Sequence, residues 1–333
     1  MTLLHKKIDI IIPVYNGEDF IEEALSSVIK QTYKPENVFV INDGSTDKTK
    51  EIVEKYAHTS PISITLIQKE NGGLSSARNR GIKESTAEYI AFLDADDVWE
   101  STKLEEQMHV FENTEYPTLG LVYCGYDIIN THGIHDTDEY VVPLDTTYRG
   151  MVFEKVLSAN KILSSGSGVL IKKEVFDTVG LFDETLRFGE DWDMWIRIAE
   201  KYAIDYTPQK LVHIRRHEES MTTNKPFQVF KGQIILYTKW IHLLQNKYAI
   251  PRAWTRTITL KTILRFPRTD FISYLKKEVP SDIYKALFAR YYGSLIYAGI
   301  VCTLRQIGTS LFSYTDWKRI FILLKRKIKT ILP

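Results

Sequence analysis

The stretch Tyr89-Ile-Ala-Phe-Leu-Asp-Ala-Asp-Asp-Val-Trp99 runs from an apolar segment directly into three carboxylates. Residues 89–93 contain no glycine or proline, and their aromatic and aliphatic side chains predict a buried strand. Asp94, Asp96 and Asp97 then crowd together where that strand ends. Such acids repel one another unless a positive charge lies between them, and clustered carboxylate oxygens suit Mg²⁺ or Mn²⁺. Taken alone, the cluster favours a solvated acidic turn that caps the next helix, because short motifs of this kind often occur by chance.

The sequence before this stretch alternates between strand-like and helix-like patterns. Strands are predicted over 8–14, 37–42, 62–67 and 89–93, and helices over 19–30, 47–56 and 74–83. Strands separated by helices of this length predict βαβ units and a mostly parallel sheet with flanking helices. In such sheets ligands bind outside the carboxyl ends of the strands, so the loops that follow the strands are the candidate binding segments.

The later part of the chain divides into a mixed region and a helical region. Two further strands, over 121–126 and 167–172, and a helix over 189–201 complete the mixed part. Strand patterns stop near residue 227, and helices are predicted over 233–245, 281–292 and 317–332. The sequence therefore predicts an α/β catalytic domain over residues 1–224 and a helical C-terminal region over 225–333.

Composition indicates a globular protein of a reducing compartment. The 333 residues are 44% hydrophobic and 26% charged, which is ordinary for such proteins. The two cysteines, Cys124 and Cys302, form neither a disulfide framework nor a zinc motif. The longest uncharged run, 291–304, is shorter than the ~20 residues that span a bilayer. A cytoplasmic location is expected, with no transmembrane helix and no nucleic acid as partner.

The chain ends in a basic segment. Residues 318–333 contain six lysines and arginines and no acid, which leaves 37 basic and 42 acidic residues in the rest of the chain. Apolar residues alternate with these basic residues at helical spacing, which suits a helix lying on an anionic membrane surface. A helix packed on the protein body with a solvated basic face fits the same pattern. The sequence leaves both interpretations open.

The loops after the first two predicted strands carry polar side chains suited to a ligand. The first loop is Pro13-Val-Tyr-Asn-Gly-Glu18, and the second is Asn42-Asp-Gly-Ser-Thr-Asp47. Ser45 or Thr46 is expected to cap the helix that follows the second loop. Asp43, at the tip of its strand, is expected to be free to accept hydrogen bonds from a ligand.

Three more segments add charged groups to the same expected edge. In Asn71-Gly-Gly-Leu-Ser-Ser-Ala-Arg-Asn-Arg-Gly81, two glycines begin a helix whose amino end favours anions, and Arg78 can reach phosphate oxygens in bidentate fashion. Gly189-Glu-Asp-Trp-Asp-Met-Trp195 places acids where they also complement a helix dipole. The segment 215–221 contains two arginines, a histidine and a serine, which can face a diphosphate or a metal.

Together these motifs resemble the inverting glycosyltransferases of family 2, which have the GT-A fold. The resemblance covers roughly residues 6–220 and rests on the order and spacing of Pro13-Val-Tyr-Asn16, Asp43-Gly-Ser-Thr-Asp47, Asn71-Gly-Gly with Ala77-Arg-Asn79 and Gly81, Leu93-Asp-Ala-Asp-Asp97, and Glu190-Asp-Trp-Asp193. It implies a Rossmann-like, mostly parallel sheet and a nucleotide-sugar donor, most often a UDP-sugar. The helical remainder lies outside the resemblance.

The resemblance also implies roles for individual residues. The nucleotide-binding side chains would be Pro13, Tyr15, Glu18 and Asp43, which line the uracil and ribose pocket, and Arg78, which stands near the nucleotide.

The reacting end of the donor has its own implied residues. Asp94 and Asp96 would hold the ribose and a divalent metal, Mn²⁺ or Mg²⁺, on the diphosphate, with Asp97 beside them. Asp191 resembles the general base, with Glu190 as the first alternative, and Arg216 and His217 would lie near the leaving diphosphate.

The predicted function is transfer of a hexosyl or N-acetylhexosaminyl group to a hydroxyl of a glycan, in the synthesis of a bacterial surface polysaccharide or glycoconjugate. The acceptor can be free or lipid-linked, and extension of a protein-linked glycan is an alternative. A silent nucleotide-sugar binding module and a membrane-recruiting scaffold are two others. A dehydrogenase is disfavoured because no Gly-x-Gly-x-x-Gly follows the first strand. The sugar, the linkage and any oligomer are not predicted.

Overall fold

The computed structural model describes residues 6–135, 144–162 and 166–218, together with Gly232, Ile235, Leu236, Lys239 and Trp240. The chain forms two compact units, residues 1–236 and 237–333, and nearly all of the described residues belong to the first. The helices expected over 281–292 and 317–332 lie outside the described residues, as does most of the one over 233–245. The domain boundary at residue 224 stays a prediction.

The described part of the first unit alternates strands and helices, as the sequence pattern predicts. The strands are β1 (Ile8–Val14), β2 (Asn37–Asn42), β3 (Ser63–Gln68), β4 (Tyr89–Phe92), β5 (Val98–Trp99), β6 (Leu119–Ile129), β7 (Val169–Lys172) and β8 (Ala203–Arg215). The α-helices are α1 (Ile21–Ile29), α2 (Thr49–Thr59), α3 (Leu74–Glu84), α4 (Lys103–Glu112), α5 (Phe153–Ser158), α6 (Glu174–Val179) and α7 (Glu190–Lys201), and a 3₁₀ turn, η1, covers Gly166–Gly168.

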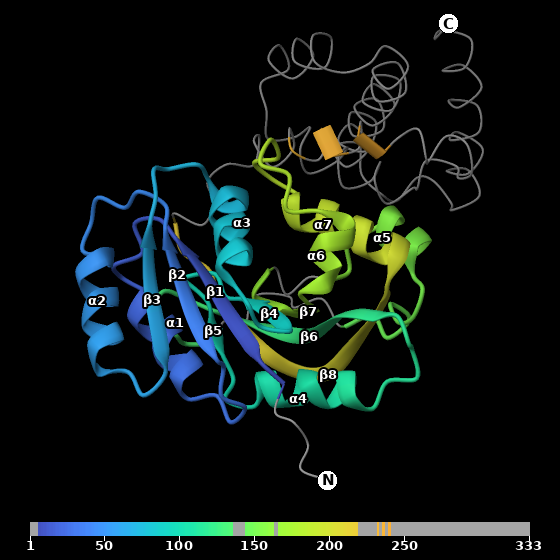
Figure 1. The fold of residues 1–333 in the computed structure, drawn as a ribbon, viewed down its shortest axis with the longest axis horizontal. Helices are drawn as coiled ribbons and strands as arrows, with labels where there is room; N and C mark the ends of the chain where they lie inside the picture. The colour runs from blue at the N-terminus through green and yellow to red at the C-terminus, as the bar shows by residue number, and fades with distance from the viewer. Residues whose placement is uncertain are drawn as a thin grey trace, which may run out of the picture. The chain divides into compact units, whose positions relative to one another are not determined.

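All eight strands form one mixed sheet in the order β3-β2-β1-β4-β7-β6-β8-β5 (Figure 1). The first four strands in this order are parallel to one another. Strand β7 then pairs antiparallel with both β4 and β6, β8 runs parallel to β6, and β5 closes the edge antiparallel to β8. The predicted α/β class with a mostly parallel, helix-flanked sheet is confirmed.

Strand β1 lies at the centre of the fold and is buried along its whole length. Ile8, Ile10 and Ile12 enter the hydrophobic core that α1, α2 and α4 cover. Ile11 points to the other face, where Gly81 of α3 packs so closely that a Cβ there would lie 2.4 Å from the Ile11 Cγ2. Figure 1 shows α3, α6 and α7 on the side of the sheet opposite α4. Two-sided burial explains why β1 reads as a continuous apolar run.

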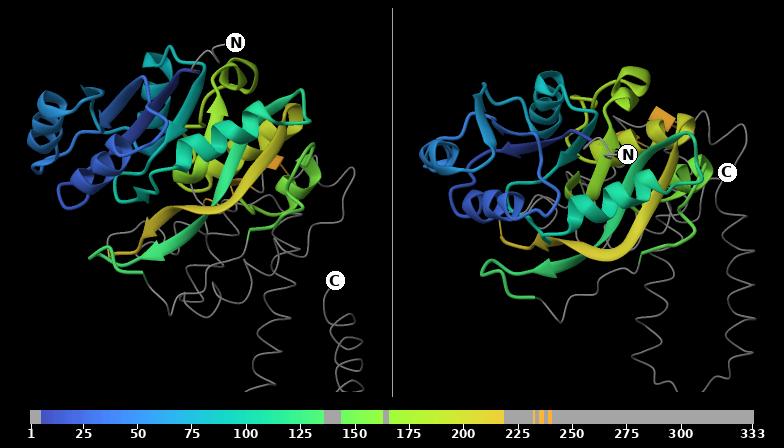
Figure 2. Two further views of the ribbon diagram at one scale, coloured as in Figure 1. Left: turned by 90° about the horizontal axis from the view of Figure 1, so that it is seen from below. Right: turned by 60° about the horizontal axis from the view of Figure 1, so that its bottom comes forward.

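Strand β8 is not predicted by the sequence pattern, because Pro208 interrupts it. Thr207 pairs with Cys124 of β6, and the next pair joins Lys210 to Gly125, so Pro208 and Gln209 lie in a bulge. Proline has no N–H to donate to a ladder, and a bulge removes that need. The strand thus continues past its proline for thirteen residues, and both views of Figure 2 show β6 and β8 side by side.

The predicted cap of the second helix is wrong in its residue. Neither Ser45 nor Thr46 caps α2; instead one carboxylate oxygen of Asp47 accepts hydrogen bonds from the Thr49 backbone N–H at 3.1 Å and the Thr49 hydroxyl at 2.6 Å. An ionised carboxylate is the stronger acceptor at a positive helix end.

Among the described residues, no helix combines the length and apolar character needed to cross a membrane.

Candidate active site

The acidic cluster after β4 separates into one buried and two accessible carboxylates. Asp97 is 3% exposed; its carboxylate accepts a hydrogen bond from the Ser167 hydroxyl at 2.6 Å and another from the backbone N–H of Arg215 at 3.1 Å. Burial, together with the charges of Asp96 and Asp94, raises the pKa of Asp97 well above its ordinary value. The side chains of Asp94 and Asp96 are 22% and 35% exposed. These two carboxylates are therefore the ones that a metal or a donor can reach.

Arg78 supplies the positive charge beside Asp94. Its guanidinium lies 2.8 Å from the Asp94 carboxylate and 3.1 Å from the Glu190 carboxylate, with a side chain only 1% exposed. The Phe92 and Phe182 rings lie 5.9 and 5.4 Å from its centre. Arg78 is thus enclosed and already bonded to two carboxylates, and its expected contact with phosphate stays a prediction. Its side chain joins two motifs that are far apart in the sequence.

His217 and Arg215 supply the positive groups beside Asp96. His217 Nε2 lies 3.1 Å from the Asp96 carboxylate, and its ring packs 4.8 Å from the Phe20 ring. Arg215 donates to the Asp96 carbonyl at 2.9 Å and also pairs with Glu23. The structure therefore brings His217 to the acidic cluster, and its expected place near a leaving diphosphate stays a prediction. Its neighbour Arg216 donates its backbone N–H to the Ile129 carbonyl at 2.8 Å.

The first turn of α7 carries the predicted base. Gly189 precedes the helix with a φ of 78°, a value that favours glycine. Burial raises the pKa of Glu190 to about 7, with the Asp191 charge adding to the shift and Arg78 opposing it. Burial also raises the pKa of the half-buried Asp191, again against Arg78. The Asp191 carboxylate accepts a hydrogen bond from the Trp192 N–H at 2.6 Å.

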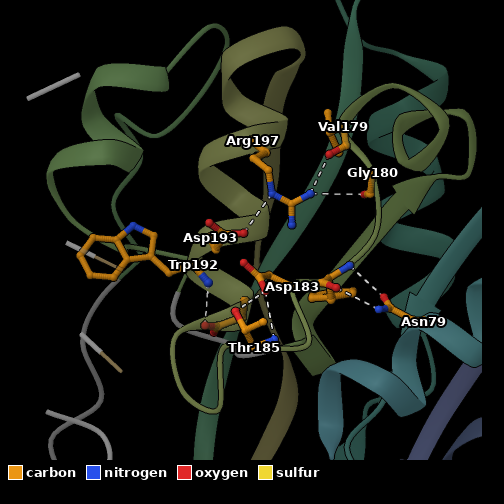
Figure 3. A network of polar contacts seen from close by, with 10 residues as sticks. Asn79, Val179, Gly180, Asp183, Thr185, Trp192, Asp193 and Arg197 are labelled. Carbon is orange, nitrogen blue, oxygen red and sulfur yellow. Dashed lines mark hydrogen bonds and ion pairs between the residues drawn. The ribbon is translucent and has the colours of Figure 1, made fainter. Parts of the chain in front are cut away.

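The polar contacts of two side chains, Arg197 and Asn79, set the position of α7 (Figure 3). Arg197 pairs with the fully buried Asp193 at 3.0 Å and donates to the Val179 carbonyl at 2.7 Å, which ties α7 to the end of α6. Asn79 of α3 exchanges two hydrogen bonds with the backbone of Phe182, at 2.8 and 2.9 Å, in the segment between α6 and α7. The helix that presents Asp191 is therefore tied to α3 and α6.

The expected nucleotide pocket begins with two interlocked loops. The N–H groups of Asn16, Gly17 and Glu18 donate to the side chains of Ser45, Thr49 and Asp47, each at 2.9 Å. Glu18 returns a contact by accepting the Lys48 N–H at 3.0 Å. The loops after β1 and β2 are thus held together as one surface.

The expected nucleotide side chains differ in access on this surface. Tyr15 is 55% exposed, although it adjoins the buried Pro13 and Val14 of β1. An exposed aromatic ring beside buried strand ends can stack on a base. Pro13 itself is buried within β1.

Asp43 is not free to meet a ligand with all of its acceptor sites. It is 3% exposed, and its two oxygens accept hydrogen bonds from the N–H groups of Gly72 and Gly73 at 2.9 and 2.7 Å, while Lys69 lies 2.5 Å away. A carboxylate has about four acceptor sites, so one remains. The glycine amides expected to approach an anionic ligand are thus used within the protein. A buried charge needs such donors nearby.

Ser167 is a functional residue that the sequence reasoning missed. Its hydroxyl accepts a hydrogen bond from the Asp94 N–H at 3.0 Å and donates to Asp97, so it holds the acidic loop in shape. A Cβ at the preceding Gly166 would lie 2.6 Å from an Arg78 nitrogen. A glycine is therefore required at position 166 for close packing, and the small residues of this segment were the available signal.

Sequence comparisons match this chain to a family model and to curated relatives. The sequence model of Glycosyl transferase family 2 matches residues 9–180. An uncharacterised glycosyltransferase of Rickettsia prowazekii is 35% identical over 94% of this chain and 96% of its own length. The minor teichoic acid biosynthesis protein GgaB of Bacillus subtilis is 30% identical over 71% of this chain, which corresponds to 26% of GgaB.

Solved structures share the fold at low sequence identity. S. aureus TarS (1–349) in complex with UDP-GlcNAc aligns with a TM-score of 0.61 at 17% identity, over 84% of this chain and 83% of TarS. Mannosyltransferase PcManGT from Pyrobaculum calidifontis, in complex with GDP-Man and Mn²⁺, gives 0.56 at 19% identity, over 90% and 81%. The fold is that of the GT-A glycosyltransferases. The chain belongs to glycosyl transferase family 2 and is a glycosyltransferase.

Replacing Arg78 by methionine should destabilise the fold, because it leaves two carboxylates facing each other without their shared cation. Removing one partner of a buried ion pair costs about 3–5 kcal/mol. The same change at Arg80, whose pair with Glu84 is exposed, should cost no more than about 1 kcal/mol.

The loss in R78M should depend on pH. Glu190 has its folded-state pKa raised to about 7. The folded protein therefore binds this proton more tightly than the unfolded chain, and the free energy of unfolding falls as pH rises. Without Arg78 the pKa of Glu190 should rise further, so the difference in unfolding free energy between wild type and R78M should be larger at pH 8 than at pH 5. Urea unfolding at pH 5 and pH 8 measures this difference. If R78M lost no more stability than R80M, Arg78 would not be the shared cation of Asp94 and Glu190.

Proposed function

We propose that this glycosyltransferase moves a sugar from a UDP-sugar to a glycan hydroxyl in a metal-dependent, inverting reaction. The observation that carries the proposal is the Arg78 bridge, which joins Asp94 to Glu190 at 2.8 and 3.1 Å. Through it the candidate metal ligands and the candidate base lie at one edge of the sheet. A binding site without catalysis would not need the two motifs to be joined in this way.

The residues around Asp96 fit a divalent cation. Asp94 and Asp96 offer accessible carboxylate oxygens, and His217 Nε2 lies 3.1 Å from Asp96. Carboxylates with an imidazole suit Mn²⁺, and carboxylates with water suit Mg²⁺. Bound there, the ion would offset the negative charge of the departing diphosphate. Mn²⁺ in PcManGT supports this assignment.

The remaining residues have separate roles in sugar transfer. Tyr15, Glu18 and the open acceptor site of Asp43 hold the nucleotide, while Arg216 and His217 stabilise the leaving diphosphate. Asp191 takes the proton from the acceptor hydroxyl as its oxygen attacks the anomeric carbon, and Glu190 is the alternative base. Attack opposite the diphosphate inverts the configuration and needs no covalent intermediate on the protein. UDP-GlcNAc in TarS supports a UDP-sugar.

A panel of UDP- and GDP-sugars, scored for nucleotide release with and without EDTA, tests the donor and the metal together. We expect one UDP-sugar to be hydrolysed slowly, and EDTA to stop the release. Asp96→Asn should also stop it, whereas Asp177→Asn, which changes an exposed acid on α6, should not. Full nucleotide release in EDTA would refute the metal dependence, and preference for a GDP-sugar would refute the UDP-sugar as donor.

Asp191→Asn should lower turnover by a factor of about 10² or more, the scale of general-base loss, with donor affinity nearly unchanged. In the wild type, turnover should fall as the pH drops through the raised pKa values of the Glu190–Asp191 pair, because a protonated carboxyl cannot accept a proton. Single-turnover kinetics and donor titration measure both effects. If Glu190→Gln lost turnover and Asp191→Asn did not, the base would be Glu190.

The acceptor belongs, in this proposal, to a bacterial surface polymer, which the similarity to a teichoic acid protein supports. The basic residues of the segment 318–333 lie outside the described residues, and their sequence pattern is one that fits an anionic membrane surface carrying lipid-linked acceptors.

Deleting residues 315–333 should release the protein from anionic vesicles and lower transfer to lipid-linked acceptors, while donor hydrolysis is retained. Six basic residues, at about 1 kcal/mol each near an anionic surface, supply the attraction. Co-sedimentation at low salt measures it, with neutral vesicles as the control. Equal binding of the full-length and shortened proteins would show that the segment is not a membrane anchor.

A further inference from the structure

Three metal-ligating side chains meet where β6 and β8 approach their ends, apart from the Asp94–Asp96 pair. Asp127 of β6 is the direct neighbour of His213 in the parallel ladder between the two strands. His135 forms an isolated antiparallel bridge with Ile129 of β6. Ile129 lies two residues after Asp127 on that strand. Residues two apart on a strand share a face. One potential ligand atom from each of these three side chains lies within 4.8 Å of the other two.

His213 is oriented as a ligand would be. Its Nε2 lies 2.8 Å from a carboxylate oxygen of Glu100, which assigns the ring proton to that nitrogen. Its Nδ1 is buried and has no hydrogen-bond partner among the described residues. A buried polar nitrogen without a partner costs stability. Histidines that bind metals commonly donate their other N–H to a carboxylate in this way.

The two other side chains complete an accessible set of ligands. One oxygen of Asp127 accepts a hydrogen bond from Lys210 at 2.6 Å, and the other accepts none from the part of the chain that the structure describes. His135 is exposed, and its ring meets that of His213 edge to face at 5.1 Å. An ion could therefore enter from solvent at His135 and come to rest against the buried nitrogen of His213.

We propose that Asp127, His135 and His213 form a second metal site, which binds Zn²⁺ and is oriented by Glu100. Two imidazoles and one carboxylate suit zinc, whereas Mg²⁺ prefers oxygen ligands alone. Three protein ligands leave a fourth tetrahedral position for water. The site would fasten the turn over 130–135 to β8. It is independent of the metal proposed at Asp94 and Asp96.

Zinc titration of the full-length, EDTA-stripped protein against a fluorescent chelator tests the site. Wild type should bind one Zn²⁺ tightly in a large excess of Mg²⁺. Glu100→Gln should weaken this binding by about 10- to 100-fold, the usual effect of losing a ligand's hydrogen-bond partner. His135→Ala and His213→Ala, which remove ligands, should weaken it further.

Matched variants separate this site from its surroundings. His132→Ala removes an exposed histidine of the same turn and should leave zinc affinity unchanged. Asp96→Asn should also retain the tight zinc, because that residue belongs to the other cluster. Zn²⁺ should raise the unfolding midpoint of wild type and of H132A but not of H135A, since it binds only the folded site.

Two results would overturn the proposal. The first is zinc affinity in H135A equal to that of wild type, which would place the ion elsewhere. The second is loss of the tight zinc in D96N, which would assign the ion to the Asp94–Asp96 pair. Because the side chain of His135 is exposed, H135A should fold, and its unfolding curve without metal checks this.

Discussion

The Arg78 guanidinium, held between Asp94 and Glu190, is the interaction on which the geometry of this site depends. Asp94 follows β4, and Glu190 begins α7, so the two carboxylates come from parts of the chain about a hundred residues apart. Both are crowded by further acids, and both lie in surroundings where a bare charge is costly. A single enclosed cation satisfies them together. Because it is planar and always charged, arginine suits this position better than lysine.

The acidic cluster illustrates how burial assigns different roles to neighbouring residues of one type. Asp97 turns inward, where Ser167 and the Arg215 N–H stabilise its oxygens. Asp94 and Asp96 remain accessible beside it. The buried carboxylate shapes the loop, and the accessible pair is left for ligands. Three carboxylates in four residues therefore differ in access: one is structural, and two are candidates for binding a ligand.

Much of the fold could be predicted from the sequence, because two-sided burial of β1, β2 and β4 leaves plain apolar runs, and helices of ordinary length separate them. Strand β8 could not, since the bulge that accommodates Pro208 depends on its partner β6. The motifs of the site were recognisable as well. What the motifs could not show is which partners each side chain meets: Asp43 is occupied by Gly72 and Gly73, and Arg78 by two carboxylates. Such pairings arise from tertiary packing, which spacing along the chain does not encode.

The end of β8 connects the two candidate metal sites. His213 contacts Glu100, Arg215 contacts the Asp96 carbonyl, and His217, just beyond the strand, contacts the Asp96 carboxylate. These residues are spaced by two, so in an extended segment they point to one side. All three reach the segment that follows β4. Arg215 also donates to the carbonyls of Asn130 and Thr131, in the turn that carries His135. Fastening that turn to β8 would therefore restrict the same strand end that orients His217 toward Asp96.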